Sequence, residues 1–304
     1  MNTDSFSFDG FRMNTFSRID TGSGARFDEG PQDHDQRLYE PVGTASMIAR
    51  LEDVDAAQIE RFHEQGCLTV EQGFDGDRVR GTVDAIDDFI KGENADFEQI
   101  HFEQGAEGRV EHLTAQQRLE AVRKITDFTS CDARLHDLAT DAALLDVVER
   151  IVGGRPKMIQ EMALLKMPGG REKPWHQDRA YFHVAMDETV VGAWIALDEA
   201  TIANGCMRVL AGANTAGPVV HFIVRDWQIC DRDILEHDVR PIAVPLRPGG
   251  ILFFDSYLPH GTPVNHTDQM RRALQFHYTA DRAGEITQEQ RLAVFGSEGK
   301  NVTC

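Results

Sequence analysis

Residues 248–262 read PGGILFFDSYLPHGT. A Pro-Gly-Gly turn is followed by Ile251 to Asp255, a short aliphatic and aromatic run that is typical of a buried strand. A turn-prone piece, Ser256 to Pro259, then leads to His260. The stretch therefore predicts a buried strand followed by a turn that presents a histidine.

The same pattern extends over the second half of the chain. After Arg155, short β-prone runs are separated by Pro and Gly turns at 168–170, 204–205 and 248–250, and no long helix intervenes. This pattern favours an antiparallel sandwich or jelly roll, so we expect a mainly β fold with helical additions. The expected strands are Lys157 to Met167, Thr189 to Leu197, Met207 to Leu210, Ile242 to Leu246, Ile251 to Asp255 and Arg272 to Thr279.

The first half of the chain has mainly helical periodicity. Apolar residues recur three and four positions apart, as in helices with one buried face. Gly66 supplies a stop before the strand-like residues 67–70, and Gly153-Gly154 ends the last expected helix. The expected helices cover residues 53–63, 77–90, 115–125 and 133–152.

The domain organisation follows from these patterns. Residues 1–45 show neither a period of two nor one of 3.6, and we expect a flexible or wrapping N-terminal arm. One main domain is expected over residues 46–290, with its helices mainly in the first half, followed by a C-terminal tail at 291–304.

Composition restricts the partners and the compartment. The formal net charge of −19 repels phosphate polyanions, and it disfavours a bulky phosphorylated substrate unless basic residues at a pocket mouth, such as Arg171 and Lys173, override it. No apolar run approaches the roughly 18–20 residues of a membrane helix, and a secretory signal is absent. The five cysteines are scattered, which indicates reduced thiols. We expect a cytoplasmic monomer or homodimer with a small-molecule substrate, binding neither nucleic acid nor membrane.

Three residues form a candidate metal site. His176 and Asp178 are two positions apart, which on an extended strand places both side chains on one face. With His260 they provide two imidazoles and one carboxylate, the facial set that leaves positions open on iron(II) for a chelating cosubstrate and O2. A zinc hydrolase uses the same ligand types, so the triplet alone leaves both open.

Arg271 favours the iron interpretation. A 2-oxoglutarate molecule that chelates iron presents a distal carboxylate, which a planar two-pronged guanidinium suits. Residues 261–270 are loop-like, so the chain can reverse and place the Arg271 strand beside the strand that leads to His260. Arg271, Gln275 and His277 then share one face, and Arg272 faces the opposite side.

Four motifs resemble the phytanoyl-CoA dioxygenase family: WHQDRAYF (175–182), NGCMRVLAG (204–212), PGGILFFDSYLPHGT (248–262) and NHTDQMRRAL (265–274). The resemblance covers most of residues 55–280. It implies a double-stranded β-helix, a cupin-like jelly roll, with helices packed on one side. It assigns iron(II) to His176, Asp178 and His260 and 2-oxoglutarate to Arg271, and it suggests Thr262, Trp194 and Gln177 at the cosubstrate site.

The resemblance is incomplete beside the pocket. Ala211-Gly212-Ala213-Asn214 stands where many members read Pro-Gly-Ser-His, which puts the substrate in doubt more than the chemistry. Asp178 is present, whereas halogenating relatives lack the metal carboxylate, so hydroxylation is favoured. Substrate contacts are expected from Gln160, Met162, Tyr181 and Phe182, each of which has core packing as an alternative role.

The sequence thus predicts a dioxygenase that hydroxylates an unactivated C–H bond of a small or medium-sized metabolite and releases succinate and CO2. Iron(II), 2-oxoglutarate and O2 are the expected cofactors, with ascorbate as a candidate activator. Three alternatives remain open: desaturation, epimerisation or cyclisation at the same site, a non-catalytic jelly-roll binding protein, and a zinc enzyme.

Overall fold

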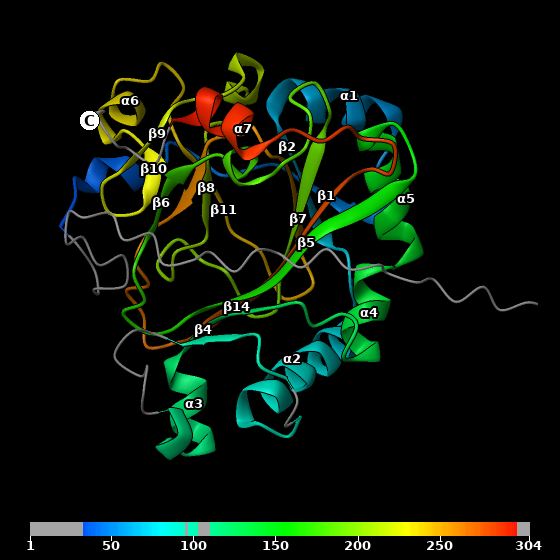
Figure 1. The fold of residues 1–304 in the computed structure, drawn as a ribbon, viewed down its shortest axis with the longest axis vertical. Coiled ribbons are helices and arrows are strands. Elements are labelled where there is room, and N and C mark those ends of the chain that lie inside the picture. The colour runs from blue at the N-terminus through cyan, green and yellow to red at the C-terminus, as the bar shows by residue number, and fades with distance from the viewer. Residues whose placement is uncertain (1–32, 95–96, 103–109, 297–304) are drawn as a thin grey trace, which may run out of the picture.

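Two β-sheets form the core of the protein, and helices pack on the larger one (Figure 1). The computed structural model describes residues 33–94, 97–102 and 110–296. The larger sheet has the strand order β1-β2-β12-β7-β14-β5-β4-β3, and the smaller has the order β11-β8-β13-β6. All of these pairings are antiparallel except that of β1 with β2. The predicted jelly-roll fold, mainly β with helical additions, is confirmed.

The six strands predicted in the second half are present within one or two residues of their expected bounds, whereas the strands at 173–176, 221–223, 227–229 and 260–262 lie outside the predicted runs. The larger sheet contains β1 (Met47–Arg50), β2 (Cys67–Gln72), β3 (Ile100–Phe102), β4 (Val122–Thr126), β5 (Pro156–Lys166), β7 (Val190–Ala196), β12 (Ile251–Asp255) and β14 (Arg271–Ala280). The smaller sheet contains β6 (Lys173–His176), β8 (Met207–Val209), β11 (Ile242–Val244) and β13 (His260–Thr262). A hairpin pairs β9 (His221–Ile223) with β10 (Trp227–Ile229).

Helices occupy the first half, one later connection between strands and a segment after the last strand. They are α1 (Ala56–Gln65), α2 (Gly76–Lys91), α3 (Ala115–Ala121), α4 (Ala133–Ala139), α5 (Ala142–Val152), α6 (Asp231–Leu235) and α7 (Gln288–Phe295). Short 3-10 turns are η1 (Gln36–Tyr39), η2 (Leu51–Asp53), η4 (Val110–His112), η5 (Asp178–Tyr181) and η6 (Ala213–Ala216). Within the described ranges, none of these helices has both the length and the apolar character needed to span a membrane.

Strand alternation divides the larger sheet into two faces. Leu274 of β14 pairs with Ala163 of β5, and both belong to the core beneath α2, α4 and α5 (Figure 1). The next pair, Ala273 and Leu164, points to the opposite side and packs with Trp194 inside the barrel. Because side chains alternate along a strand, one strand supplies both the helix-packed core and the barrel interior.

Two expected helices are shorter than their periodicity indicates. The run 115–125 is helical only to Ala121, because Val122 has an extended backbone with ψ of 140° and begins β4, which pairs with β5. β-branched residues in this run favour the strand. The run 133–152 divides into two helices because the Asp141 carboxylate caps α5, where it accepts from the amides of Ala143 and Leu144.

The cysteines differ from the expectation at one position. Cys67, Cys131 and Cys206 are free thiols, whereas Cys230 is disulfide-bonded. The expectation of reduced thiols is therefore wrong at Cys230. Cys304 lies outside the described residues.

Part of the expected arm packs against the smaller sheet. Leu38 is fully buried, and its carbonyl accepts a hydrogen bond from the Trp175 indole at 3.0 Å. Residues 33–45 thus contact the strand that carries His176. The remainder of the expected arm, residues 1–32, lies outside the described residues. The expected boundary between domain and tail falls within α7.

Candidate metal and cosubstrate site

Strands β6 and β13 bring two histidines together. His176 and His260 are direct partners in the antiparallel pairing, with ring centroids 4.3 Å apart. The Nδ1 atom of His176 lies 2.8 Å from the Pro174 carbonyl, and that of His260 lies 2.9 Å from the Leu258 carbonyl. Because a carbonyl only accepts, each Nδ1 carries the proton and each Nε2 presents a lone pair. The fold therefore orients two imidazoles as ligands.

Asp178 completes the group from the start of η5. Its Oδ1 lies 3.1 Å from His176 Nε2, and its Oδ2 lies 3.6 Å from His260 Nε2. All three side chains are buried, and one ligand atom from each lies within 4.8 Å of the others. This spacing and donor set could hold one transition-metal ion on a single face.

Two residues of β14 position the Asp178 carboxylate. Gln275 Nε2 donates to Asp178 Oδ2 at 3.0 Å, and His277 Nε2 lies 2.8 Å from the same oxygen. Both contacts fall on Oδ2, so Oδ1 remains available beside His176. Partners of this kind fix the orientation of a ligand.

The protonation states suit metal binding. Burial raises the pKa of Asp178, but the surrounding imidazoles of His260, His176 and His277 outweigh burial and hold this pKa well below its usual range. Burial lowers the pKa of His260 to about 4. At neutral pH the group therefore offers a carboxylate and a neutral imidazole without further proton loss.

Arg271 begins β14 inside the barrel. Its Nη1 donates to the Gly205 carbonyl at 2.7 Å, and its guanidinium carbon lies 5.2 Å from the centroid of the Trp194 ring. Its Nε is buried without a hydrogen-bond partner, and burial lowers the pKa of Arg271 to about 10. Among the described residues no carboxylate pairs with this guanidinium. A buried cation in this state is suited to an incoming anion.

Lys166 lies beside Arg271 as its partner across β5 and β14. The Lys166 ammonium donates to Thr262 Oγ1 at 2.8 Å, to the Thr262 carbonyl at 3.3 Å and to the Pro263 carbonyl at 2.6 Å. Because Thr262 Oγ1 accepts from Lys166, its own proton is left for another acceptor. The expected donor, Thr262, is therefore oriented by a residue that the sequence interpretation did not include.

The other two expected cosubstrate residues differ in their surroundings. Trp194 is buried on β7 and pairs with Gln275 of β14, next to Arg271. Gln177 is also buried, but its amide nitrogen donates to the carbonyls of Gly217 and Tyr257 at 2.8 and 2.6 Å. Both amide protons are thus used by backbone groups, which favours a positioning role for Gln177 over direct contact.

The expected substrate residues lie beside His176 or beside the two residues that position Asp178. Gln160 pairs with His277, and Met162 pairs with Gln275, so both lie on the barrel face of β5. Tyr181 meets the His176 ring edge-on at 6.1 Å. The Phe182 ring lies 4.7 Å from the His277 ring.

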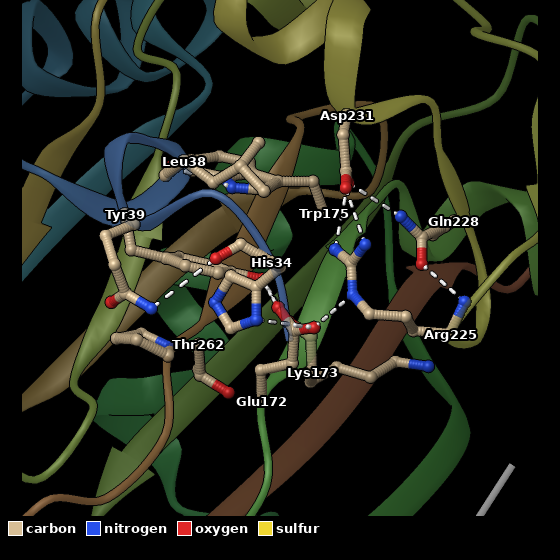
Figure 2. Close-up of polar contacts among 12 residues, drawn as sticks. His34, Leu38, Tyr39, Glu172, Lys173, Trp175, Arg225, Gln228, Asp231 and Thr262 are labelled. Carbon is tan, nitrogen blue, oxygen red and sulfur yellow. Dashed lines mark hydrogen bonds and ion pairs between the residues drawn. The ribbon is translucent and has the colours of Figure 1, made fainter. Parts of the chain in front are cut away.

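A buried polar network fixes the start of β6 (Figure 2). Glu172 accepts from the Tyr39 hydroxyl at 2.5 Å and pairs with the Arg225 guanidinium, and His34 Nδ1 lies 3.4 Å from the same carboxylate. Arg225 also binds Asp231 through two nitrogens, at 2.5 and 2.9 Å. The described part of the arm and the β9–β10 region are thereby joined to the strand that carries His176.

Several of these positioning residues were missed from the sequence. Lys166 follows Gln160 and Met162 in the same alternation on β5, so the period of two pointed to it. His277 shares the face of Arg271 in the predicted alternation, but that pattern alone does not indicate that its ring reaches Asp178. Glu172 carried no local signal, because its partners come from residues 34, 39 and 225.

The fold and these three facing ligands define a jelly-roll protein with a two-histidine, one-carboxylate site, the type found in non-haem iron oxygenases. The family model described as phytanoyl-CoA dioxygenase (PhyH) matches residues 62–273. The chain therefore belongs to the phytanoyl-CoA dioxygenase family, as its motifs predicted.

Individual curated relatives share about a quarter to a third of the aligned residues with this chain. The methylphosphonate hydroxylase of Gimesia maris is 32% identical over 159 residues, which cover 52% of this chain and 58% of the relative. The phytanoyl-CoA dioxygenase of Arabidopsis thaliana is 23% identical over 246 residues, covering 72% of this chain and 87% of the relative. For several others the chain spans only 50–55% of their length.

Solved structures show the same fold. EctD from S. alaskensis, with 2-oxoglutarate and 5-hydroxyectoine, superposes with a TM-score of 0.60 at 23% identity and covers 83% of each chain. The non-heme alpha ketoglutarate dependent carbocyclase SnoK has a TM-score of 0.61 at 18% identity, covering 84% of this chain and 95% of its own. At these identities the likeness extends to the fold alone.

Proposed function

We propose that the protein is an iron(II)- and 2-oxoglutarate-dependent dioxygenase that hydroxylates an unactivated C–H bond of a small or medium-sized metabolite. The observation that carries the proposal is two incomplete binding groups in one barrel. These are three metal-ligand atoms that face one another, and a buried guanidinium with no carboxylate partner among the described residues. A metal alone uses only the first group, whereas a chelating 2-oxoacid with a distal carboxylate uses both.

His176 and His260 would hold iron through Nε2, and Asp178 would hold it through Oδ1. Three protein ligands on one face leave the opposite face for exogenous ligands. Iron(II) bound there with 2-oxoglutarate and O2 would supply the oxidant for C–H hydroxylation, and 2-oxoglutarate would leave as succinate and CO2.

The cosubstrate tail would bind beside Arg271 and Thr262 inside the barrel. Arg271 would pair with its carboxylate, and the Thr262 hydroxyl, oriented by Lys166, would donate to the same group. The Trp194 ring would cover the guanidinium, with which it already stacks. Gln177 would contribute by fastening the loops at 217 and 257.

The barrel wall excludes water from the reacting centre. The Phe254 ring lies 4.8 Å from the His260 ring and 5.7 Å from the His277 ring, and the Phe182 ring lies 4.7 Å from the His277 ring. A wall without water strengthens the electrostatic attraction between Arg271 and the cosubstrate carboxylate, and it limits the consumption of 2-oxoglutarate in the absence of substrate. Gln160, Met162, Tyr181 and Phe182 remain the proposed substrate contacts.

Hydroxylation is the preferred outcome because Asp178 keeps the metal carboxylate. Relatives named methylphosphonate hydroxylase and 2-aminoethylphosphonate dioxygenase support oxygen insertion into small molecules. The epimerase SnoN and the carbocyclase SnoK share the fold, so epimerisation or cyclisation at the same site is the second proposal. Product analysis by mass spectrometry separates the two, because only hydroxylation adds an oxygen atom from O2.

The deciding experiment is anaerobic visible spectroscopy. Wild-type protein with iron(II) should develop a weak charge-transfer band when 2-oxoglutarate is added. Arg271→Ala should need a 2-oxoglutarate concentration on the order of 100-fold higher for the same band, because the ion pair with the distal carboxylate is lost. Arg247→Ala is the matched control, since Arg247 is an exposed surface residue. A folded wild-type protein that binds iron but shows no band would overturn the proposal.

We further propose that the enzyme works in the cytoplasm as a monomer or homodimer and that ascorbate activates it by keeping iron reduced. Fractionation of the source cells tests the compartment, and light scattering tests the oligomeric state. Turnover measured with and without ascorbate tests the activator.

A further inference from the structure

A buried arginine directly follows the metal ligand Asp178 and has no role in the reaction described above. The Arg179 side chain is almost completely buried. Its backbone amide donates to the Ser256 carbonyl at 2.9 Å, just beyond the end of β12. Because Asp178 and Arg179 are consecutive residues of η5, whatever the guanidinium binds is held in a defined place relative to the metal ligands.

The guanidinium and a neighbouring tyrosine bind three consecutive backbone carbonyls. Arg179 Nη2 donates to the Val184 carbonyl at 2.9 Å and also to the Ala185 carbonyl. The guanidinium carbon lies 5.4 Å from the centroid of the Tyr257 ring. The Tyr257 hydroxyl in turn donates to the Met186 carbonyl at 3.0 Å. Two side chains that stack on each other thus hold one short stretch of backbone.

This backbone belongs to a segment beside the candidate metal site. We call residues 182–186 the wall segment. The ring of its first residue, Phe182, lies 4.7 Å from the ring of His277, which binds Asp178 Oδ2. Val184 is buried in the same small apolar cluster as Phe182. The position of the wall segment therefore determines how much room is left next to the residues that hold the metal.

An arginine is a costly residue for this contact. Its Nε and Nη1 atoms are buried without a hydrogen-bond partner, and within the described part of the chain the Arg179 guanidinium forms no ion pair. Burial of an unpaired charge and of unsatisfied donors destabilises a fold. An apolar side chain of similar size would fill the space at lower cost, but it could not bind the two carbonyls. The cost indicates that the arginine serves to set a position more than to add stability.

We propose that Arg179 is a positioning residue that fixes the wall segment, and with it the Phe182 ring, in the place that the primary substrate requires beside the metal ligands. The link to substrate rests on the proposed function, whereas the constraint on the segment does not. Arg179 acts through the backbone at Val184 and Ala185. Loss of its side chain should therefore loosen the wall segment and leave the binding of metal and cosubstrate unchanged.

Hydrogen exchange measures the constraint in metal-free protein. The Ala185 amide donates to the Gly284 carbonyl at 2.7 Å and the Glu188 amide to the Ala185 carbonyl at 3.0 Å, so a peptide that covers residues 182–188 reports on the wall segment. In Arg179→Met this peptide should exchange about tenfold faster, the equivalent of one lost hydrogen bond, while β7 and β14 keep wild-type rates. Unchanged exchange in the peptide, or faster exchange throughout the chain, would overturn the proposal.

Two variants separate the hydrogen bonds from the packing around them. Tyr257→Phe keeps the ring against Arg179 and removes only the bond to the Met186 carbonyl, so exchange in the peptide should rise less than in Arg179→Met. Arg179→Lys keeps a charged donor and should restore part of the protection. Arg247→Ala, an exposed surface change, should match wild type. Equal exchange in Arg179→Lys and Arg179→Met would contradict the proposal, because donated hydrogen bonds would then have no part in the constraint.

Spectroscopy and turnover distinguish this role from support of the metal ligands. Cobalt(II) bound to Arg179→Met should show the visible bands of the wild-type complex, with an affinity within twofold; altered bands would assign Arg179 to the ligand geometry and overturn the proposal. With iron(II), 2-oxoglutarate and O2 but no primary substrate, the variant should release succinate severalfold faster, because water enters past a looser wall. A wild-type rate would count against the proposal. If wild-type protein releases no succinate at all, the proposed function fails, while the exchange experiment still decides whether Arg179 holds the wall segment.

Discussion

Replacing His277 by Phe should weaken metal binding without weakening the fold. His277 donates through Nε2 to Asp178 Oδ2 at 2.8 Å, while its Nδ1 is buried without a hydrogen-bond partner. Phe keeps the ring contacts with Phe182 and Phe254. It removes a charge-assisted bond worth about 1.5–3 kcal/mol together with an unsatisfied nitrogen that costs about 1–3 kcal/mol. The two terms offset each other, so the free energy of unfolding of metal-free protein should change by less than about 1 kcal/mol.

The metal affinity should respond differently. In His277→Phe, Asp178 Oδ2 retains only the Gln275 amide at 3.0 Å, and the carboxylate is free to turn its Oδ1 away from His176. Loss of a donor to a metal ligand typically lowers affinity by about 10–100-fold. Gln275→Met removes the second donor and should act in the same direction.

The assay is competition for cobalt(II) or iron(II) against a coloured chelator under anaerobic conditions, with urea denaturation of the metal-free variants alongside. Arg247→Ala controls for unrelated surface changes. A metal affinity within twofold of wild type in a folded His277→Phe protein would refute the reasoning. Equal losses of stability and affinity would do so too, since they would indicate a purely structural role.

Three further predictions follow from buried contacts. Lys166→Met should raise the dissociation constant for 2-oxoglutarate about tenfold, because the Thr262 hydroxyl is then no longer oriented, and should leave the metal affinity unchanged. Calorimetry measures both affinities. An unchanged dissociation constant for 2-oxoglutarate would contradict this role of Lys166. Glu172→Gln should lower the free energy of unfolding by about 3–5 kcal/mol, because Arg225 loses a buried charged partner. Urea denaturation measures this free energy, and a loss under about 1 kcal/mol would contradict a stabilising role for the Glu172–Arg225 pair. Burial lowers the pKa of His221 from 6.5 to about 3. The contribution of His221 to the free energy of unfolding is therefore complete above pH 6.5. It is lost as the pH falls, because between these two pKa values only the unfolded chain takes up the proton. By pH 4 the lost free energy of unfolding reaches about 3 kcal/mol. Metal-free His221→Phe should show a correspondingly flatter stability profile between these pH values, and an identical slope in both proteins would exclude the assignment.

The sequence predicted those features that depend on local periodicity. The bounds of β12 and nearly those of β14 follow from their apolar runs, and the alternation along β14 identified which side Arg271 shares with Gln275 and His277. The break between α4 and α5 was missed, because apolar residues continue at helical spacing through it and only the capping by Asp141 interrupts the helix. Local patterns thus define elements better than they define where two elements meet.

The roles of individual polar residues were harder to predict for a different reason. The Lys166–Thr262 hydrogen bond forms because the fold brings β5 close to β13. The residue pattern within either strand does not specify that the two strands approach each other. The same applies to Gln177, whose sequence position suggests cosubstrate contact although its amide binds loops at 217 and 257. Long-range pairing determined both outcomes.

The arrangement makes the site sensitive to the register of a single strand. Arg271, Gln275 and His277 occupy alternate positions of β14, so the proposed carboxylate anchor and both donors to Asp178 face inward together. A shift by one residue would turn all three outward and bring Arg272 inward, where it would lose its ion pair with Asp198. On the outer face, the ion pair of Arg272 and the packing of Leu274 and Phe276 against the helices therefore stabilise the register of β14. The side chains on the inner face depend on this register, although they do not contact the residues that stabilise it.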